Sequence, residues 1–274
     1  MNVATHAPRT YLFVPGDRPE RFEKALASGA DAVVLDVEDA VSSQAKGVAR
    51  DAIARFLTRA MPEQRERLVI RINDESSPWF EADLHMLRDN HAAWVMLPKA
   101  EKTGTVTRVR AICPAVDVLA LIETAVGVLR AEAIATAPGV QRLVFGTIDF
   151  ALDLGLSGDP VGFDYAASRL ALASRAAGLP PPVAGVTPDI HDERPLLADL
   201  ERARGHGFSA KLCIHPKQIA PIHRALQPSA EEVSWAHRVI AAAESANGAV
   251  QVDGRMIDKP VLQRAHALLA KHRP

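Results

Sequence analysis

The chain carries almost none of the features that tie a protein to a disulfide scaffold, a membrane or a nucleic acid. Its only cysteines are Cys113 and Cys213, which lie in no metal-ligand spacing, so a reducing compartment fits better than a disulfide scaffold. The 32 Lys and Arg residues balance 33 Asp and Glu residues, so no global charge attracts nucleic acid or an anionic membrane. No run reaches the roughly 18 apolar residues of a membrane span, and the N-terminal segment lacks the apolar stretch of a signal peptide. We expect a cytoplasmic protein that binds neither a membrane nor nucleic acid.

Four widespread enzyme motifs are also missing. The sequence contains no GxGxxG, no phosphate-binding P-loop, no GxSxG and no HExxH. Each motif supplies a group that its enzyme class needs, from the glycine-rich turn of dinucleotide sites to the paired histidines of zinc proteases. Dinucleotide, nucleotide, serine-hydrolase and zinc-protease functions therefore lose their usual support.

The chain instead repeats a short apolar run that turns polar only at its C-terminal end. The pattern occurs at residues 32–38, 68–73, 94–99, 118–123 and 142–149. Strands without polar alternation are typical of parallel sheets, in which both faces are buried. Because α/β barrels place their chemistry at the carboxyl ends of such strands, these polar ends form the candidate site.

Strand and helix signals alternate along most of the chain. Eight strands are predicted, at residues 11–14, 32–37, 68–72, 94–97, 118–122, 143–145, 182–186 and 210–214. The predicted helices include residues 19–27, 44–59, 79–89, 164–177 and 193–204, and Gly178 is a typical C-terminal stop. The 274 residues, 48% of them hydrophobic, suffice for one barrel of about 250 residues. The sequence thus predicts an α/β protein with a TIM (β/α)8 barrel, whose closure leaves no free sheet edge.

The tail beyond Pro228 departs from this alternation. Ser229, with Glu232 three residues later, has the capping-box pattern and begins a predicted helix that runs to about Ala246. A turn, a short extended segment and a second turn follow, and the last predicted helix covers residues 260–270. We therefore expect a barrel domain at residues 1–227 and a C-terminal helical extension at residues 228–274, placed at a subunit interface.

Glu123 and Asp149 are the first candidate metal ligands. Each follows an apolar run, and the two runs are consecutive in the chain, so we expect both carboxylates at one rim, one strand apart. Two convergent carboxylates with open positions for water and substrate oxygens suit Mg²⁺. Either residue alone would more often cap a helix or pair with an arginine, but the two together favour a metal.

Arg71 ends the third predicted strand, where a guanidinium is costly among apolar neighbours. Its planar fork suits bidentate binding of a substrate carboxylate, and a structural salt bridge to Asp36 or Glu38 is the equally weighted alternative. Asp36, Glu38 and Asp39 crowd the end of the second strand. We expect these three acids to support Arg71 or metal-bound waters from behind rather than to touch the metal.

Other polar residues near the strand ends have weaker cases. His215, which precedes a proline, is more often a turn residue than a general base. Lys211 flanks the eighth strand, and Lys99 is a candidate for Schiff-base chemistry only if it is buried. Because a proline directly precedes Lys99, an exposed or phosphate-directed ammonium is favoured there. Arg18 and Lys24 lie on a predicted amphipathic helix, where a solvated face is the usual role of such residues.

The motifs resemble those of the citrate lyase β-subunit-like lyases of the HpcH/HpaI aldolase superfamily, which includes malyl-CoA and citramalyl-CoA lyases. The matching segments are RTYLFVPGDRPERFEKA, DAVVLDVEDAV, RIN, LPK, IET, FGTIDFALDLG, KLCIHPKQI and GRMIDKP. They extend from Arg9 to Pro260 in the order of the family. The match is specific for the family and weak for the substrate.

The resemblance implies a TIM barrel assembled as a homotrimer or homohexamer. Glu123 and Asp149 would ligate Mg²⁺, Arg71 would bind the substrate carboxylate or 2-oxo acid, and the backbone at Gly146 and Thr147 would contact the oxo acid. Asp258 matches an aspartate that CoA-lyase relatives contribute to a neighbouring subunit. No organic cofactor is implied. Arg18 and Lys24 are where CoA phosphates could bind.

The leading functional hypothesis is a Mg²⁺-dependent lyase that cleaves a citryl, malyl or citramalyl thioester, on CoA or acyl carrier protein, to an acetyl thioester and a 2-oxo acid. The alternative enzyme is a malate-synthase-like or citramalate-synthase-like condensing enzyme, which joins acetyl-CoA to an oxo acid and hydrolyses the thioester. A third hypothesis, from another class, is a non-catalytic barrel subunit. The sequence leaves the acyl chain, the carrier and the direction open.

Overall fold

The computed structural model describes residues 7–245 and 250–271 and divides into two compact units. One unit is Pro8–Ile222, and the other comprises the described residues from His223 onward together with Ala7. The sequence had placed this boundary after residue 227. The first unit contains every strand-end residue of the candidate site.

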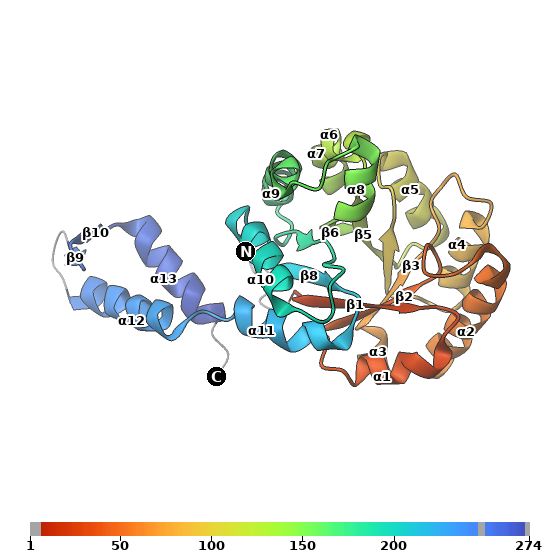
Figure 1. The fold of residues 1–274 in the computed structure, drawn as a ribbon, viewed down its shortest axis with the longest axis horizontal. Coiled ribbons are helices and arrows are strands. Elements are labelled where there is room, and N and C mark those ends of the chain that lie inside the picture. Colours follow the sequence, from red (N-terminus) through yellow and green to blue (C-terminus); the bar gives the residue numbers. More distant parts are fainter. Residues whose placement is uncertain (1–6, 246–249, 272–274) are drawn as a thin grey trace. The chain divides into compact units, whose positions relative to one another are not determined.

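Eight parallel strands close into a barrel, which confirms the predicted fold (Figure 1). Their order around the barrel is their order in the chain, and β1 pairs with both β2 and β8. The strands are β1 (Thr10–Pro15), β2 (Ala32–Asp36), β3 (Leu68–Arg71), β4 (Trp94–Leu97), β5 (Asp117–Ile122), β6 (Val140–Phe145), β7 (Val183–Ala184) and β8 (Ala210–Cys213).

The barrel interior is filled by alternate residues of the strands. Val34, Val69, Met96 and Leu212 belong to this inner cluster. Their neighbours in sequence, such as Leu35, point to the other face and are buried as well. Because successive side chains of a strand point to opposite faces, burial on both faces explains why the strands show no polar alternation.

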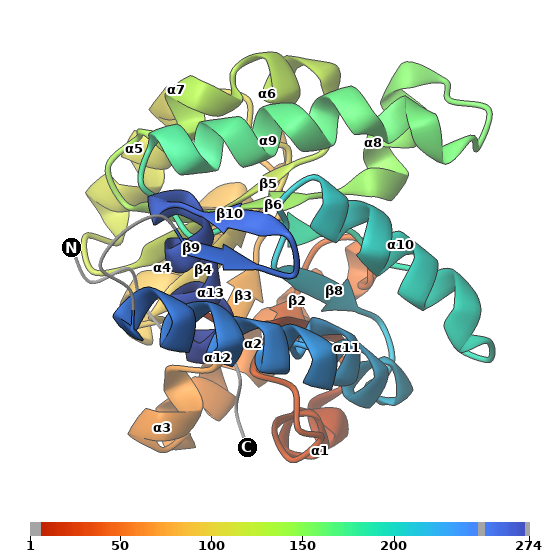
Figure 2. The ribbon, with the colours of Figure 1, turned by 90° about the vertical axis from the view of Figure 1, so that its left-hand side faces the viewer.

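Helices surround the barrel (Figure 1), and α9 runs along the outside of β6 (Figure 2). In α2, buried positions 49, 52, 53 and 56 recur at the spacing of one helical face. The helical segments of this unit are η1 (Pro19–Arg21), α1 (Phe22–Leu26), η2 (Ser43–Ala45), α2 (Lys46–Arg59), α3 (Pro62–Arg65), α4 (Phe80–Asp89), α5 (Thr103–Ile112), α6 (Ala125–Leu129), α7 (Ala131–Ala135), α8 (Thr147–Leu154), η3 (Pro160–Phe163), α9 (Asp164–Ala176), α10 (Glu193–Gly205), η4 (Pro216–Gln218) and α11 (Ile219–Leu226), which crosses into the second unit.

The amino end of the barrel is closed by Arg142. Its Nη1 donates to the Pro8 carbonyl at 2.6 Å and to the Tyr11 hydroxyl at 3.2 Å, and its Nη2 donates to Ser209 Oγ at 2.9 Å. The guanidinium is therefore satisfied although the residue is only 2% exposed. The candidate site residues lie at the opposite, carboxyl end, which is called the mouth below.

Two local expectations need correction. Asp149 does not end a strand, because β6 stops at Phe145 and Asp149 lies in the first turn of α8. The predicted strand at residues 182–186 is reduced to Val183–Ala184, since β7 pairs with each neighbour at only one or two positions. The predicted stop at Gly178 is confirmed, because α9 ends at Ala176 and Gly178 has a φ of 72°.

The second unit is a small helical assembly with its own core. It contains α12 (Ala230–Ser245), β9 (Val250–Val252), β10 (Arg255–Ile257) and α13 (Lys259–Lys271). Ala236, Val239 and Ala265 are fully buried between the two helices. Asp253 and Gly254 both have positive φ, as a tight turn between antiparallel strands requires. Ala246, the predicted helix end, lies outside the described residues.

No helix in the described ranges is both long and apolar enough to cross a membrane.

The capping box predicted at Ser229 is present. The Glu232 amide donates to Ser229 Oγ at 3.0 Å, and the Ser229 amide donates to Glu232 Oε2 at 2.9 Å. Ser229→Ala should therefore lower the free energy of unfolding of the C-terminal unit by about 1 kcal/mol. Hydrogen exchange at the Glu232 amide should become faster. Ser42→Ala is the matched control, because Ser42 precedes η2 without a side-chain cap bond. Equal exchange at Glu232 in wild type and Ser229→Ala would contradict the prediction.

Candidate active site

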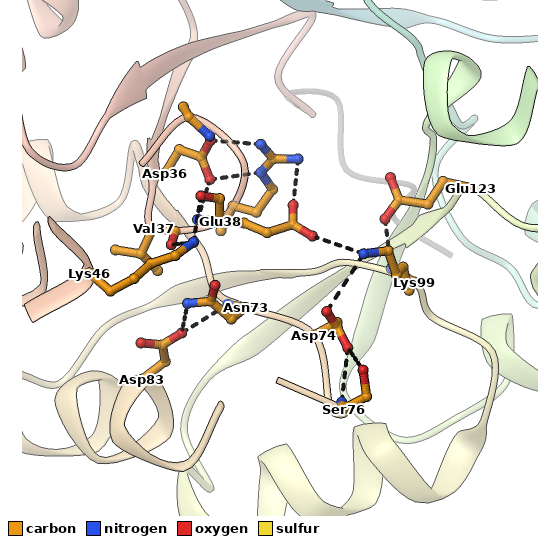
Figure 3. Close-up of polar contacts among 12 residues, drawn as sticks. Asp36, Val37, Glu38, Lys46, Asn73, Asp74, Ser76, Asp83, Lys99 and Glu123 are labelled. Atoms are coloured by element: carbon orange, nitrogen blue, oxygen red, sulfur yellow. Dashed lines mark hydrogen bonds and ion pairs between the residues drawn. The ribbon is translucent and has the colours of Figure 1, made fainter. Parts of the chain in front are cut away.

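Arg71 and Asp36 form the centre of the polar network at the barrel mouth, and Figure 3 shows Asp36, Glu38, Lys99 and Glu123 of this network. Arg71 Nε donates to Asp36 Oδ1 at 2.8 Å, and Nη2 donates to Oδ2 at 2.6 Å. Neighbouring strands bring the two residues together, since β2 and β3 pair Asp36 with Arg71. The guanidinium also lies over the Phe13 ring, 4.9 Å from its centroid. The structural salt bridge weighed from the sequence is therefore formed.

Glu38 joins this pair and extends it across the mouth. Its Oε2 lies 2.7 Å from Arg71 Nη1, and its Oε1 lies 3.7 Å from Lys99 Nζ. Lys99 Nζ is also 3.6 Å from Asp74 Oδ2 (Figure 3). The loops that follow β2, β3 and β4 are thus linked by alternating negative and positive groups.

Lys99 has an unusual backbone conformation that serves Glu123. Its φ is 45°, in the left-handed region that disfavours residues with a side chain. This conformation accompanies a 2.8 Å hydrogen bond in which the Lys99 amide donates to Glu123 Oε1. The Lys99 side chain is 45% exposed and ion-paired, which argues against Schiff-base chemistry at this lysine.

Glu123 lies at the end of β5 in a space that Gly146 leaves open. A Cβ at position 146 would come within 2.6 Å of both Glu123 Cβ and Glu123 Oε2. The Glu123 side chain is buried, and within the described structure the Lys99 amide is its one hydrogen-bond donor. One oxygen of this buried carboxylate is therefore available to another ligand.

Asp149 and Thr147 approach this region from the first turn of α8. Asp149 is partly exposed, and its carboxylate makes no hydrogen bond or ion pair with any residue of the described chain. Thr147 Oγ1 lies only 2.2 Å from where a Cβ at Gly185 would be, so Gly185 allows the hydroxyl to pack against β7. Gly146 thereby makes room for the Glu123 carboxylate that the sequence analysis had selected, and Gly185 for the side chain of Thr147, of which the sequence analysis had selected the backbone.

Burial and crowding of negative charge shift two carboxyl pKa values at the mouth. Burial raises the pKa of Glu123 to about 8, and the charges of Glu38 and Asp149 add to the rise. Burial also raises the pKa of Glu38 to about 7, although the Arg71 cation opposes the rise. Burial alone would lower the pKa of Arg71, but Asp36 and Glu38 raise it. The mouth thus has an excess of carboxylates that a further cation would relieve.

The donor set fits Mg²⁺. Three acidic or metal-ligating side chains do not converge anywhere in residues 7–245 and 250–271, so a complete protein cage is absent from this part of the chain. Mg²⁺ does not require one, because it keeps several waters and is usually held by one or two carboxylates together with substrate oxygens. The free oxygen of Glu123 and the unpaired carboxylate of Asp149 match that requirement.

Two further residues hold the acidic loops in place, and the sequence analysis missed both. Lys46 Nζ donates to the Val37 carbonyl at 2.8 Å and to the Glu38 carbonyl at 2.7 Å. Asp83 Oδ2 accepts from the Asn73 amide at 2.8 Å. Asp83 was detectable, because it lies on the buried stripe of α4 at the spacing of Phe80, Leu84 and Leu87. Nothing in the sequence around Lys46 distinguishes it from an exposed lysine.

The remaining predicted residues lie elsewhere. Asp39 is exposed, and its charge contributes to the raised pKa of Glu38. His215 is the turn residue that the sequence favoured, since its Nδ1 accepts from the Lys217 amide at 3.2 Å. Lys211 is buried in β8, and Asp258 caps α13 in the second unit, where its Oδ1 accepts from the Val261 amide.

Arg18 and Lys24 are both exposed, on the loop after β1 and on α1. Arg18 Nε lies 3.9 Å from Asp17 Oδ1. Their exposure is compatible with a solvated face.

The fold and its acidic mouth define an α/β-barrel protein with a carboxylate site at the carboxyl ends of its strands. The family model for HpcH/HpaI aldolase/citrate lyase matches residues 9–216, and the chain belongs to this family. The resemblance found in the sequence is thereby confirmed.

Similar proteins cover nearly the whole chain. A citrate lyase subunit beta-like protein of Mycobacterium tuberculosis (strain CDC 1551 / Oshkosh) is 38% identical over 278 residues, which are 99% of this chain and 97% of the relative. A (3S)-malyl-CoA thioesterase of Cereibacter sphaeroides (strain KD131 / KCTC 12085) is 35% identical over 272 residues, 97% and 95% of the two chains. The crystal structure of protein CitE from Mycobacterium tuberculosis in complex with magnesium, acetoacetate and coenzyme A superposes with a TM-score of 0.87 at 36% identity, covering 97% of this chain and 98% of that chain.

The contact between Gly146 and Glu123 gives a direct test of the site. Gly146→Ala should destabilise the fold by about 1–3 kcal/mol, because the new methyl group must displace the Glu123 carboxylate. Gly104→Ala in α5 is the matched control, since a Cβ there meets no atom within 4 Å, and it should stabilise by about 0.5–1 kcal/mol. Urea unfolding measures both changes. If Gly146→Ala proves as stable as wild type, the space beside Glu123 is less restricted than the structure indicates.

Proposed function

We propose that the protein is a Mg²⁺-dependent carbon–carbon lyase that cleaves a 3-hydroxyacyl thioester to an acetyl thioester and a 2-oxo acid. The observation that carries this proposal is the position of two carboxylates with free oxygens, Glu123 and Asp149, on the same mouth as Arg71. Citryl, malyl and citramalyl thioesters are the candidate substrates, carried on CoA or on acyl carrier protein. Relatives of this chain carry lyase and thioesterase names, and one solved relative holds magnesium, acetoacetate and coenzyme A.

The reaction breaks the bond between the hydroxyl-bearing carbon and the carbon next to the thioester. The hydroxyl loses its proton as it becomes the oxo group, and the electron pair of the broken bond passes to the thioester as an enolate. Protonation of that carbon gives the acetyl thioester. Mg²⁺ held by Glu123 and Asp149 would supply the positive charge that polarises the substrate oxygens.

The chain's own residues would orient the substrate around these two carboxylates. Arg71 has five N–H donors, and its contacts with Asp36 and Glu38 leave two of them for a substrate carboxylate. The turn at Gly146 and Thr147 would bring backbone groups to the oxo acid. Asp36, Glu38 and Asp39 would hold Arg71 and nearby waters rather than touch the metal.

Asp258 would supply the acid–base group to a neighbouring subunit. Asp258 belongs to the second unit, where its carboxylate caps α13. The proposed assembly is a homotrimer or homohexamer in the cytoplasm. Activity would then require the oligomer, because each mouth would be completed by another copy's tail.

Hydrolysis of a hydroxyacyl-CoA is the second candidate function, and the (3S)-malyl-CoA thioesterase relatives favour it. A condensing enzyme that joins acetyl-CoA to an oxo acid before hydrolysis would use the same groups. The purified protein should be incubated with malyl-, citramalyl- and citryl-CoA plus Mg²⁺, and the products identified by mass spectrometry. A lyase gives acetyl-CoA and a 2-oxo acid, whereas free CoA with intact hydroxy acid would overturn the lyase proposal.

Glu123→Ala and Asp149→Ala should each abolish turnover and weaken Mg²⁺ binding while the barrel stays folded, because rim carboxylates contribute little to the barrel core. Titration calorimetry with Mg²⁺ and circular dichroism measure the two properties. Asp51→Ala is the control, since Asp51 is an exposed acid on α2. Unchanged Mg²⁺ affinity in both site variants would contradict the assignment of Glu123 and Asp149 as metal ligands.

Arg71→Lys keeps the positive charge but loses the planar fork. It should weaken binding of a 2-oxo acid such as pyruvate by roughly tenfold or more, since bidentate geometry is lost. Unfolding by urea should be measured alongside, because the same change also loosens the bond to Asp36. Loss of stability with normal pyruvate affinity would show that Arg71 is purely structural.

An Asp258→Ala subunit keeps its own mouth intact, and an Arg71→Ala subunit keeps its tail intact. Mixing the two inactive proteins under conditions of subunit exchange should restore part of the activity, because some interfaces pair an intact mouth with an intact tail. Mass spectrometry verifies the exchange. Verified exchange without recovered activity would mean that Asp258 acts within its own subunit or not at all.

A further inference from the structure

A cavity on the outside of the barrel wall lies next to the proposed lyase site, since Thr147 at the start of α8 is part of its lining. It lies between β6, β7 and β8 on one side and α8, η3, α9 and α10 on the other, and its volume is about 400 Å³. Most of its lining is apolar, including Phe145, Phe163, Ala184, Val186 and Phe208. This volume and lining are typical of a site for a small organic molecule.

Lys211 places a charged group in the wall of this cavity. Ala210 and Leu212 belong to the barrel interior, so Lys211 between them points outward, towards the helices. The side chain is 2% exposed, and its Nζ donates to the Gly185 carbonyl at 2.7 Å. An ammonium has three N–H donors, and in the described structure this is the one hydrogen bond of Nζ, which forms no ion pair.

The acids near Lys211 are engaged elsewhere. Asp199 Oδ2 accepts from Thr187 Oγ1 at 2.5 Å. At the cavity edge, Asp164 Oδ1 lies 3.1 Å from Arg202 Nη1 and 3.0 Å from His206 Nε2. The edge charges therefore offset one another.

The Lys211 ammonium, in contrast, is buried without a counter-ion among the described residues. Burial lowers the pKa of Lys211 to about 8, and the negative charge of Asp199 opposes this shift. A buried ammonium is costly unless an anion or several acceptors compensate it. A ligand that enters the cavity with a negative end would supply the missing partner.

We propose that this cavity is a binding site for a small monocarboxylate with an apolar body. The carboxylate accepts hydrogen bonds from the two free N–H groups of Lys211, and the apolar body packs against Phe145, Phe163 and Phe208. A charge-assisted hydrogen bond in an apolar surrounding fixes the orientation of the ligand, and burial of its chain supplies the rest of the affinity.

Octanoate and 1-octanol are the probes, because they share a chain and differ in charge. Titration calorimetry on the wild-type protein at pH 7 should show octanoate binding roughly tenfold or more tightly than 1-octanol. Lys211→Met keeps the length of the side chain and removes the charge. The affinity for octanoate should therefore fall to the affinity for 1-octanol, and the affinity for 1-octanol should stay unchanged. Equal binding of both probes to wild type, or no octanoate binding at all, would overturn the proposal.

Ala203→Phe on α10 fills the cavity while Lys211 stays in place, and both probes should then lose affinity. This variant also carries the test if Lys211→Met fails to fold. Octanoate affinity in wild type should decline as the pH rises through about 8, where the Lys211 ammonium loses its proton. The decline should be absent in Lys211→Met, which separates Lys211 from His206 and the other edge charges. Octanoate that binds equally to wild type and Ala203→Phe lies outside the cavity, and the proposal fails.

Discussion

The Arg71 guanidinium holds the barrel mouth together because it is the cation around which the buried acids are arranged. Asp36 has no exposed surface and Glu38 is 4% exposed, so their charges would repel each other in a poorly solvated space. The planar fork meets both oxygens of Asp36, and its remaining arm meets Glu38. Removal of one partner from a buried ion pair typically costs about 3–5 kcal/mol, because the other charge stays buried without compensation. The position of Arg71 at the end of β3 is thus a structural requirement before any substrate arrives.

Around this pair, backbone groups and side chains fix the loops in turn. Lys46 binds the carbonyls at 37 and 38, so the loop that carries Glu38 is held through its backbone as well as through the Glu38 side chain. Asp83, itself bonded to Arg50, holds the Asn73 amide after β3. Such a connected network restricts the rotamers of the groups facing the mouth, and fixed geometry is what lets a site recognise a ligand without reorganising.

The repeated apolar runs, each with polar residues at its C-terminal end, made the barrel and the main acidic residues predictable. Strands that are buried on both faces leave a continuous apolar signal in the sequence. Arg71 was located correctly, but its two alternatives could be separated only by the pairing register that sets Asp36 beside it. Asp149 was placed one element too early, because an apolar helix start such as TIDFAL looks like the continuation of a strand. The role of Lys46 depends on a loop geometry that no local pattern encodes. The roles of Glu123 and Asp149 towards a metal remain predictions.

At Lys99, the stability of the fold and the charge of the mouth favour different residues. Its left-handed backbone costs of order 1–2 kcal/mol relative to glycine, and the amide it directs at Glu123 would be equally well supplied by a glycine. A search for heat-resistant variants would therefore favour glycine at this position. Each such gain would remove the ammonium that balances Glu38 and Asp74, and would leave a more negative mouth. A screen for stability alone would thus select against the Lys99 ammonium. A variant chosen for its melting temperature would carry a more negative charge at the mouth than the original protein.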